Sequence, residues 1–559
     1  MIARVAVKHK INSDIVFDYK IDKDQKVPLY SIIRVNFAGK KILGIVLGFK
    51  AHSSKPCKAI EKTVSTQPFI TKQQVELARA IASYFISPFG PTLLSLLPNL
   101  PQREIAKIEE SSSMLRNRKS ISELVLSSSD QRLQYYLQKV YVNKQNLLIL
   151  PLLSQIAEAS RKIKRIYPSI QVFTWHSKLT AMQKRIIWQK CLSGENMVVI
   201  GSRDALFLPF RKLGCIFIDN PNSFSYFEDQ LPRYNAFFVA RFLQKQFNAD
   251  LFVGETFPSI TSYVAYRKNV LRLKEIGKRS NHFKIYDGFY QEIKNPTIIN
   301  RLAGTLQKAK KIAVIWPFKE NKKIICRNCN IQINCPFCKN EYYTPDFRCS
   351  QCNKKAPSFC PKCKSQNLAT VGHSKSSILD SFKSVDKNKF FFLDLDKIST
   401  LPPTFDQALI PFFDNMVDFP FVSYKEKVAT GIWQILEKVS GNIHIFTYKY
   451  KDLTSKISNF KWDDFIKNQL IERKKENLPP YVKAVKIVSK YNKVKSQTIV
   501  DDICSKLKAK NPILLSQKDD KIEFLLFFDH IRYKQVKSEL RQKLDGKLYF
   551  VVDPIDFSL

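Results

Sequence analysis

The chain has 559 residues, of which 44% are hydrophobic, so it can bury several packed cores and is not an intrinsically disordered protein. Lysine and arginine (91) outnumber aspartate and glutamate (49), and the resulting net charge of +42 predicts a polyanionic partner. Nucleic acid is the leading candidate and an anionic membrane surface the second, although no apolar run reaches the roughly 18 residues of a membrane-spanning helix. The N-terminal residues MIARVAVKHK do not resemble a signal peptide, so a reducing cytoplasm is expected.

The first part of the chain, residues 1–100, predicts a small β-rich domain. Short runs of strand type flank the sequence Ala38-Gly39-Lys40, and this pattern is typical of a hairpin. Thr71 and Gln74 have the spacing of a capping box, so a helix is predicted to begin there. Residues 101–122 are polar and poorly periodic, which indicates a linker.

Short continuous apolar runs alternate with helical stretches from about residue 123 onward. Strands of this kind are buried on both faces, as in parallel sheets covered by helices. The span is too long for one such sheet, so we predict two α/β lobes, over residues 123–270 and 271–470. Residues 471–559 mix both periodicities and predict a separate small α+β domain.

Eight of the twelve cysteines form four CxxC pairs inside the second predicted lobe. Two such pairs can surround one tetrahedral ion, so the four pairs predict two structural zinc ions in a module over residues 321–368. A disulfide framework is the alternative, and it fits a cytoplasmic chain poorly. Iron in four-thiolate sites stays open, and a catalytic zinc is disfavoured because four thiolates leave no position for water. The eight residues are Cys326, Cys329, Cys335, Cys338, Cys349, Cys352, Cys360 and Cys363.

Two α/β lobes, a zinc module and a strong positive charge together indicate a nucleic-acid motor of the helicase type. Such a motor needs the phosphate-binding loop GxxxxGK(S/T), whose glycines let backbone N–H groups approach the phosphates and whose lysine reaches the terminal oxygens. The pattern occurs nowhere in the chain, and no glycine lies between Gly90 and Gly194. The sequence therefore predicts helicase lobes that lack the phosphate loop.

Several separated segments match those of a known family in the same order along the chain. They are Phe17-Asp18-Tyr19 followed by RVNFAGKKILGIV, the segment IGSRDALFLPF at 200–210, the eight-cysteine spacing, Glu472-Arg473 with Leu478-Pro479-Pro480-Tyr481, and Val552-Asp553-Pro554. In these segments the chain resembles the PriA family of bacterial replication-restart helicases, primosomal protein N′.

The resemblance implies a multidomain α/β fold. A β-rich N-terminal domain would bind the 3′ end of DNA, two RecA-like helicase lobes would follow, the second carrying the zinc module, and a small α+β domain would end the chain. The family's winged-helix segment has no counterpart, because only residues 101–122 separate the first two domains.

The departures from the family concentrate where ATP would be handled. The family's GSGKT falls on Ser129-Asp130-Gln131-Arg132-Leu133, and its DEEH box, whose acids hold Mg²⁺, falls on Asp219-Asn220-Pro221-Asn222. GSATP becomes Gly254-Glu255-Thr256-Phe257-Pro258, and VAGRAGR becomes Val439-Ser440-Gly441-Asn442. Because the phosphate cradle, a metal-binding acid and the arginine are lost together, the comparison implies a scaffold without ATPase activity, with no catalytic residue and no need for ATP or Mg²⁺.

The pocket for the DNA end keeps suitable residues in the same comparison. The family binds the last base and the 3′ hydroxyl, and the matching positions here are Phe17, Asp18, Tyr19, Gly39 and Lys58. A carboxylate can accept base N–H groups, aromatic rings can stack, and lysine can meet a phosphate. The alternative is that Phe17 and Tyr19 pack as alternate residues of a strand, with Asp18 solvated between them.

The resemblance also implies a pairing of the cysteines and a role for an aromatic segment. One zinc would take Cys326, Cys329, Cys360 and Cys363, and the other Cys335, Cys338, Cys349 and Cys352. Residues 224–230 fall on the family's loop that senses single-stranded DNA and couples it to ATP hydrolysis, and ordinary loop packing is an equal alternative. The aromatic residues of the zinc module are expected mainly to pack around the metal sites: Phe337, Tyr342, Tyr343, Phe347 and Phe359.

Three functions compete at this point. The first is a non-catalytic DNA-binding factor of replication restart, which recognises forks or other 3′-ended junctions, is cytoplasmic and nucleoid-associated, and has partners such as single-strand-binding protein or a helicase loader. The second is an ATP-dependent 3′ to 5′ DNA helicase with a highly divergent nucleotide site. The third is a structural protein whose lysine-, asparagine- and isoleucine-rich composition merely reflects an AT-rich genome.

Overall fold

The computed structural model divides into two compact units, and each is described by itself. The first holds Met1–Gly277, Val482–Ile487 and Phe527–Ile555, and the second holds Lys278–Tyr481, Val488–Leu526 and Asp556–Leu559. The structure describes residues 1–9, 15–108, 120–228, 230–277, 282–287, 296–316, 323–329, 331–337, 342–343, 348–349, 354–371, 375–395, 398, 405–418, 422–507, 513–518, 521–545 and 547–554.

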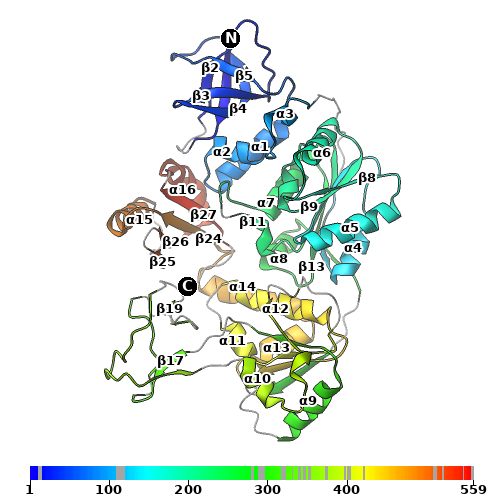
Figure 1. Cartoon of the computed structure of the whole chain (residues 1–559), viewed down its shortest axis with the longest axis vertical. Coiled ribbons are helices and arrows are strands. Elements are labelled where there is room, and N and C mark those ends of the chain that lie inside the picture. The colour runs from blue at the N-terminus through cyan, green and yellow to red at the C-terminus, as the bar shows by residue number, and fades with distance from the viewer. Residues whose placement is uncertain are drawn as a thin grey trace. The chain divides into compact units, whose positions relative to one another are not determined.

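The N-terminal domain is built on a five-stranded antiparallel sheet in the order β2-β1-β4-β3-β5 (Figure 1). A tight turn joins β3 to β4 at Ala38 and Gly39, whose φ angles of 48° and 80° confirm the predicted hairpin. One face of the sheet is buried around Val5, Tyr19 and Val35. The strands are β1 (Ile2–Val7), β2 (Phe17–Lys20), β3 (Ile32–Phe37), β4 (Lys40–Lys50) and β5 (Ile60–Thr63).

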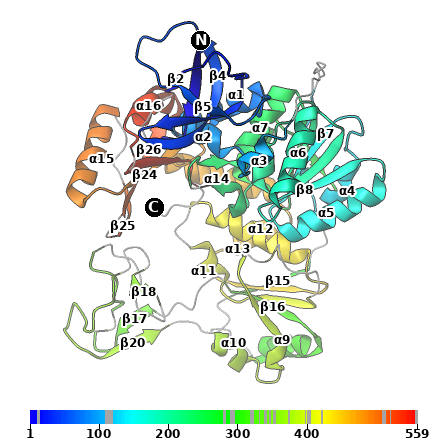
Figure 2. The same cartoon turned by 45° about the horizontal axis from the view of Figure 1, so that its top comes forward.

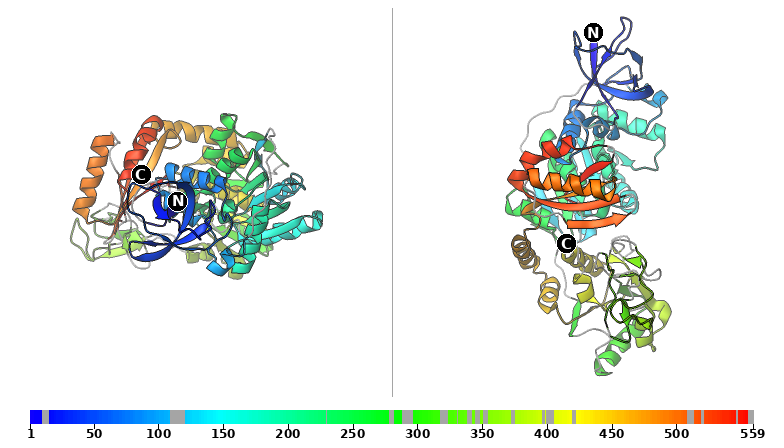
Figure 3. Two further views of the ribbon diagram at one scale, coloured as in Figure 1. Left: turned by 90° about the horizontal axis from the view of Figure 1, so that it is seen from above. Right: turned by 90° about the vertical axis from the view of Figure 1, so that its left-hand side faces the viewer.

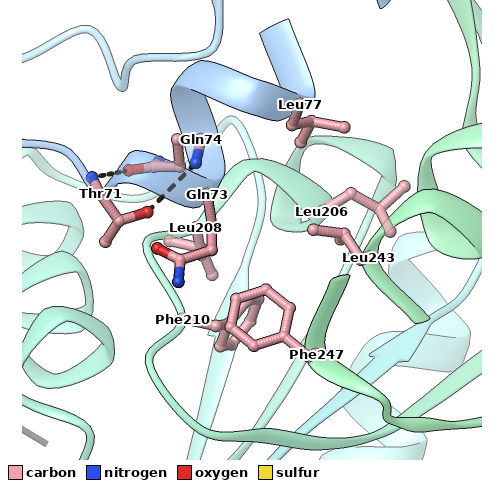
Figure 4. A pocket seen from close by; sticks show the side chains of 9 residues that line it. All are labelled: Thr71, Gln73, Gln74, Leu77, Leu206, Leu208, Phe210, Leu243 and Phe247. Carbon is pink, nitrogen blue, oxygen red and sulfur yellow. Dashed lines mark hydrogen bonds between the residues drawn. The ribbon is translucent and has the colours of Figure 1, made fainter. Parts of the chain in front are cut away.

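Helix α1 (Lys72–Tyr84) attaches this domain to the first lobe. It begins with the predicted capping box, in which Gln74 N donates to Thr71 Oγ1 at 3.2 Å and Thr71 N donates to Gln74 Oε1 at 2.9 Å. Gln74 Nε2 also donates to Phe207 O at 2.7 Å, and Trp188 Nε1 donates to Phe69 O at 3.0 Å. Apolar side chains line a small pocket beside the capping box, as Figure 4 shows for Leu77, Leu206, Leu208, Phe210, Leu243 and Phe247.

The segment predicted as a linker, residues 101–122, begins with a short docked helix. After α2 (Phe89–Ser95), helix α3 (Gln102–Ile105) buries Ile105, and Glu104 accepts a hydrogen bond from Arg185 Nε at 2.8 Å. Strand β6 then starts at Ser122, and residues 109–119 lie outside the described residues. The first part of this segment therefore packs on the lobe rather than only connecting two domains.

The first lobe contains a seven-stranded parallel sheet in the order β14-β6-β13-β10-β7-β9-β8. Every residue of β7, β9, β10 and β13 is buried, as expected for strands covered by helices on both faces. This arrangement confirms the predicted α/β lobe with a parallel sheet. The strands are β6 (Ser122–Leu126), β7 (Gln145–Ile149), β8 (Gln171–Trp175), β9 (Met197–Gly201), β10 (Leu213–Asp219), β13 (Asp250–Glu255) and β14 (Arg272–Glu275), and the helices are α4 (Ser129–Leu137), α5 (Leu153–Ile166), α6 (Ala181–Ser193), α7 (Ala236–Phe247) and α8 (Ile260–Arg267).

The second lobe contains a five-stranded parallel sheet in the order β15-β23-β22-β16-β21. Helices α9 and α10 lie on one side of it and α12 and α13 on the other (Figure 2). The first pair buries Leu306 and Ile378 against Val314 and Phe446 of the sheet. The strands are β15 (Phe283–Asp287), β16 (Ile312–Ile315), β21 (Phe390–Leu393), β22 (Gln407–Ile410) and β23 (Ile443–Thr447), and the helices are α9 (Pro296–Lys308), α10 (Lys375–Ser381), α11 (Phe413–Val417), α12 (Tyr424–Leu436), α13 (Lys451–Ser458) and α14 (Trp462–Lys475).

The cysteine module is inserted between β16 and β21, as predicted. Its described part consists of two small antiparallel ladders, one between β17 (Lys323–Cys326) and β20 (Leu368–Val371) and one between β18 (Tyr342–Tyr343) and β19 (Arg348–Cys349).

The C-terminal strands form a four-stranded sheet in the order β25-β26-β24-β27, coloured orange to red in Figure 3. Within the first unit this segment is fixed to α1, because Lys483 Nζ lies 2.6 Å from Tyr84 Oη and 2.5 Å from Asp553 Oδ2. Burial and the charge of Asp553 raise the pKa of Tyr84, so its hydroxyl stays protonated. None of the described helices is both long enough and apolar enough to cross a membrane. The elements are β24 (Val482–Ser489), α15 (Lys493–Leu507), β25 (Ile513–Lys518), β26 (Lys521–Asp529), α16 (His530–Gln542) and β27 (Leu548–Val552).

Strand β13 ends in a carboxylate that lies inside the first lobe. Glu255 is 1% exposed and accepts a hydrogen bond from Ser259 N, at the start of α8, at 3.0 Å. Loss of hydration raises the pKa of Glu255 to about 7, although the hydrogen bonds from Ser259 and Ser262 partly offset this effect. The folded state therefore binds the Glu255 proton more tightly than the unfolded chain does.

This difference in proton affinity predicts that Glu255→Gln raises the free energy of unfolding of the lobe, and by more at high pH than at low pH. The ordinary pKa is 4.5 and the folded value is about 7, so the stability cost of the wild-type carboxyl grows as the pH rises from 4.5 to 7. The substitution should stabilise the lobe by up to about 3 kcal/mol at pH 8 and by little at pH 5. Thermal unfolding at both pH values checks this. The exposed control Glu158→Gln should change little at either pH, and an equal shift at pH 5 and pH 8 for Glu255→Gln would contradict the expectation.

Candidate functional site

The turn that follows strand β6 is where a phosphate loop would lie. β6 ends at Leu126 and α4 begins at Ser129, so only Ser127 and Ser128 separate strand from helix. Both serine hydroxyls donate to Gln131 Oε1, at 2.6 and 3.1 Å. A glycine-rich loop that wraps phosphate oxygens with backbone N–H groups has no room in this short turn.

Arg132 stands where the family's lysine would be, and it is turned inward. Its Nε and Nη2 atoms donate to the two oxygens of Asp219, at 2.7 and 3.1 Å, in a fork-shaped ion pair. Nη1 donates to Thr256 Oγ1 at 3.0 Å and to Ser127 O. Arg132 is 2% exposed and Asp219 is 4% exposed. One guanidinium therefore joins the carboxyl ends of β6, β13 and β10, which are neighbours in the sheet.

Tyr136, one turn further along α4, also contacts Asp219. Its hydroxyl donates to Asp219 Oδ1 at 3.0 Å, and burial together with the charge of Asp219 raises the pKa of Tyr136, which keeps the proton on the hydroxyl. A Cβ atom added at Gly254 would lie 1.6 Å from Tyr136 Oη, so only glycine leaves space for this side chain.

These contacts test whether the lobe suits a magnesium nucleotide. In the resembled family the first acid of the DEEH box holds Mg²⁺, but here both oxygens of Asp219 are bound by Arg132, and one of them also by Tyr136. The strand-to-helix turn lacks the glycines, and the lysine is replaced. The residues present therefore do not fit a nucleotide with its magnesium ion. Sequence comparison identified the lost motifs but did not predict the ion pair. The one available signal was that Arg132 falls on the lysine of the family's GSGKT.

The segment of the second lobe on which the family's VAGRAGR falls contains no arginine. Val439–Asn442 lie between α12 and β23, and the sequence holds no arginine from residue 349 to residue 472. Arg473, the next one, is buried and donates to Val422 O at 2.7 Å and to Glu426.

The aromatic residues predicted to bind the DNA end lie on the inner face of the N-terminal sheet. Tyr19 is 4% exposed, and its hydroxyl donates to Asn36 O at 3.3 Å. Phe17 is half-buried and packs edge-on against Phe37 and His9, with ring centroids 4.8 and 5.0 Å apart. Packing is therefore the main role of Tyr19 in this structure, whereas Phe17 keeps an exposed part beside the β3–β4 turn.

Asp18 points to the opposite face of the same strand, because successive side chains alternate. It accepts a hydrogen bond from Ser53 Oγ at 2.6 Å and pairs with Lys50. Partial desolvation alone would raise the pKa of Asp18, but the contacts with Lys50 and Ser53 and the charge of Arg4 outweigh it and hold the pKa below its ordinary value.

The other two predicted pocket residues lie nearby in the fold. Gly39 is in the hairpin turn, one residue after Ala38, and a Cβ atom there would meet nothing within 4 Å. Lys58 is exposed, and its carbonyl accepts a hydrogen bond from Lys20 N, at the end of β2, at 2.9 Å. Phe17 and Tyr19 thus lie on one face of β2 and Asp18 on the other, and the role of the five residues in binding a DNA end stays a prediction.

The aromatic segment after β10 is held by the IGSRDALFLPF segment. Arg203 Nη1 donates to Ser225 O at 2.8 Å and to Phe227 O at 2.9 Å, and Arg203 Nη2 pairs with Glu228. Tyr226 is 1% exposed, whereas Phe224 is 62% exposed. Asp229 lies outside the described residues. The segment therefore combines a buried anchor with one ring that faces solvent.

Four cysteines come together as the comparison implied. The Sγ atoms of Cys326, Cys329, Cys360 and Cys363 all lie within 4.8 Å of one another. Such a closed set of four thiolates fits a tetrahedral zinc ion. For the other predicted set, Cys335 and Cys349 are buried in the same small core, while Cys338 and Cys352 lie outside the described residues.

The aromatic residues of the module divide into two groups. Tyr342 is buried, in agreement with the expected packing role, but Phe337 and Phe359 are 67% and 43% exposed. Lys354 Nζ lies 3.2 Å from the ring centroid of Phe337. The side chain of Tyr343 and all of Phe347 lie outside the described residues.

Comparison with known proteins identifies the N-terminal domain and shows which proteins the chain is similar to. The family model of the PriA 3′DNA-binding domain matches residues 4–98. Replication restart protein PriA of Helicobacter pylori is 27% identical over 396 residues, which cover 66% of this chain and 63% of that protein, less than two thirds of its length. Replication restart protein PriA of Borreliella burgdorferi is 24% identical over 542 residues, which cover 80% of each chain.

Among solved structures, RecG bound to a three-way DNA junction covers 72% of this chain and 46% of that chain, with 12% identity and a TM-score of 0.34. The matched N-terminal domain and the long alignments with these relatives agree with the ordered motifs and with the described fold. The chain is thus similar to replication restart proteins PriA over much of its length, and its residues 4–98 match the 3′DNA-binding domain of that family.

Proposed function

We propose that this protein is a DNA-binding replication-restart factor that recognises branched or 3′-ended DNA and does not hydrolyse ATP. The observation that carries the proposal is the Arg132–Asp219 ion pair, which lies at the turn where the family's phosphate loop would be, in a chain whose residues 4–98 match a 3′DNA-binding domain. DNA recognition and energy conversion are thereby separated in this member of the family.

The DNA half of the proposal is supported by domain and charge. The matched domain carries Phe17 and Asp18 on strand β2, and an aromatic ring and a carboxylate are groups that can contact a terminal base and a hydroxyl. The net charge of +42 favours a polyanion over the whole chain. DNA binding that weakens steeply with salt distinguishes this role from that of a structural protein with incidental charge.

The second half of the proposal, that the protein does not hydrolyse ATP, is supported by what phosphoryl transfer requires. Catalysis of this reaction comes almost entirely from positioning and from charges that stabilise the transferring phosphoryl group. The phosphate cradle is replaced by a turn of two serines, the metal-binding acid is paired internally, and the second lobe offers no arginine between residues 349 and 472. Retention of Asp219 is the observation that keeps a divergent ATP-driven 3′ to 5′ helicase as the second candidate.

Two zinc ions are proposed for the cysteine module, the first held by Cys326, Cys329, Cys360 and Cys363. The ions would fold the module and support its exposed Phe337 and Lys354. We further propose a cytoplasmic, nucleoid-associated protein that serves as a platform for replication proteins such as single-strand-binding protein or a helicase loader.

Discrimination of the 3′ terminus tests the DNA half. A fork that ends in a 3′ hydroxyl should bind about tenfold more tightly than the same fork with a 3′ phosphate, because the phosphate adds like charge beside Asp18 and removes a hydroxyl donor. Fluorescence anisotropy with both forks measures the ratio. Asp18→Asn should abolish the preference, and the control Asp24→Asn, at an exposed position, should keep it. Equal affinities of the wild-type protein for both forks would contradict a pocket that recognises the 3′ hydroxyl.

Phosphate release tests the negative half. The purified protein with ATP, Mg²⁺ and saturating fork DNA should release no phosphate above a no-protein blank, since the magnesium ligand is already paired. Asp219→Ala should therefore give the same trace as the wild type. DNA-stimulated release that persists through stringent purification and disappears in Asp219→Ala would establish the helicase alternative instead.

Metal content tests the module. The wild-type chain should contain about two zinc ions, and Cys360→Ser should lose one of them, because a structural site with three thiolates binds zinc far more weakly. Elemental analysis of the intact protein gives the stoichiometry. Cys504→Ser, on α15 outside the module, is the matched control and should keep both ions; iron in place of zinc, or full zinc in Cys360→Ser, speaks against the assignment.

A further inference from the structure

The segment between β10 and β11 (Phe227–Glu228) starts directly at the buried ion pair. Asp219 is the last residue of β10, and the next residue, Asn220, donates its N–H to Gly254 O at 2.7 Å. Two further turns follow, with Ser223 N donating to Asn220 O at 2.8 Å and Tyr226 N donating to Ser223 O at 3.0 Å. The backbone of residues 220–226 is thus tied to the ends of β10 and β13.

The far end of the segment returns to the same place. The side chain of Tyr226 is 1% exposed, and burial together with the charge of Asp219 raises the pKa of Tyr226. On the other side Arg203 holds the carbonyls of Ser225 and Phe227 at 2.8 and 2.9 Å. Between these two anchors Phe224 is 62% exposed.

The charge balance at Asp219 depends on Arg132. A buried carboxylate without a partner is strongly unfavourable, and it would either draw in water or move toward the surface. Arg132 also donates to Thr256, at the end of β13 next to β10, and to Ser127, at the end of β6 on the other side of β13, so its removal releases three strand ends together.

We propose that Arg132 is a built-in cation that fixes residues 220–228 in one conformation and keeps Phe224 displayed to solvent without any bound nucleotide or metal. This inference deepens the proposed function, on which it rests. An exposed ring on a fixed loop is a ready stacking surface for a base of single-stranded nucleic acid. Arg132 is a positioning residue here, because it acts through Asp219 and the loop.

Amide hydrogen exchange, read by mass spectrometry on peptides that cover residues 220–228, tests the proposal on the full chain. Arg132→Met should accelerate exchange of this segment by on the order of 100-fold relative to the wild type, since the buried carboxylate loses its charge partner. Arg132→Lys keeps the charge without the fork and should accelerate it less. If Arg132→Met does not fold, exchange of residues 220–228 is measured in Arg132→Lys and in Asp219→Asn, each of which also breaks the fork-shaped ion pair.

The matched control is another ion pair of the same unit. Arg185 Nε donates to Glu104 at 2.8 Å, so Arg185→Met breaks a partly buried pair without touching the loop. It should leave exchange of residues 220–228 within about twofold of the wild type. Equal acceleration in Arg185→Met and Arg132→Met would mean that any loss of stability frees the loop, and unchanged exchange in Arg132→Met would mean that the ion pair does not hold it. Either result overturns the proposal.

Two ligand measurements separate this proposal from the proposed function. ATP with Mg²⁺ should leave exchange of residues 220–228 in the wild type unchanged, and a change would show that the loop responds to nucleotide rather than to Arg132. Arg132→Met and Phe224→Ala should each weaken binding of a single-stranded oligonucleotide by about tenfold, with Arg185→Met unaffected. If only Phe224→Ala loses affinity, Phe224 is a stacking surface but Arg132 does not position it, and the proposal is overturned. The tests of 3′-end recognition and of phosphate release are independent of this result, because they use other assays.

Discussion

The buried ion pair between Arg132 and Asp219 is the constraint on which the first lobe depends. Asp219 closes a strand whose seven residues are all buried, so its charge cannot be carried by water. A charged group in such a position needs an opposite charge and full hydrogen bonding, and removing one partner of a buried pair costs roughly 3–5 kcal/mol. In a nucleotide-dependent lobe a metal ion could supply that charge when it binds. Here a side chain of the same chain supplies it permanently.

Arginine and lysine would act differently at this position. Lysine carries a compact charge on a flexible stem and can reach toward a ligand, whereas the guanidinium fork matches the two oxygens of a carboxylate. The Arg132 fork takes both oxygens of Asp219 and still has a donor left for Thr256. The change from lysine to arginine is therefore a change from a ligand-facing cation to one that is satisfied internally.

The two lobes and the metal module could be read from the sequence because they rest on local patterns. Parallel strands appear as apolar runs, the capping box at Thr71 as a three-residue spacing, and the four clustered thiolates as CxxC pairs. The ion pair joins residues 87 positions apart, and neither local pattern nor composition reports such a contact. Strand alternation did indicate that Phe17 and Asp18 would face opposite sides, but which side forms the core depends on how β1 and β4 pair.

The segment IGSRDALFLPF shows how family signature residues can serve structure without ATP. Phe207 offers its carbonyl to Gln74 of α1, and Arg203, four residues earlier, holds the aromatic loop. Tyr84, at the other end of α1, contacts Lys483 and Asp553 of the C-terminal segment. Within the first unit one helix thus connects the DNA-binding domain, the first lobe and the C-terminal strands.

The departures around the nucleotide region are coupled rather than independent. Tyr136 reaches Asp219 only because Gly254 has no side chain, since a Cβ atom there would lie 1.6 Å from the tyrosine hydroxyl. Arg132 would also clash, because its Cδ atom lies 2.7 Å from the same Cβ position. The glycine retained from the family motif therefore makes room for the two side chains that occupy the site. Restoring the lysine alone would leave Tyr136 on Asp219 and no glycine in the turn after β6, so a working phosphate site requires all three features to change together.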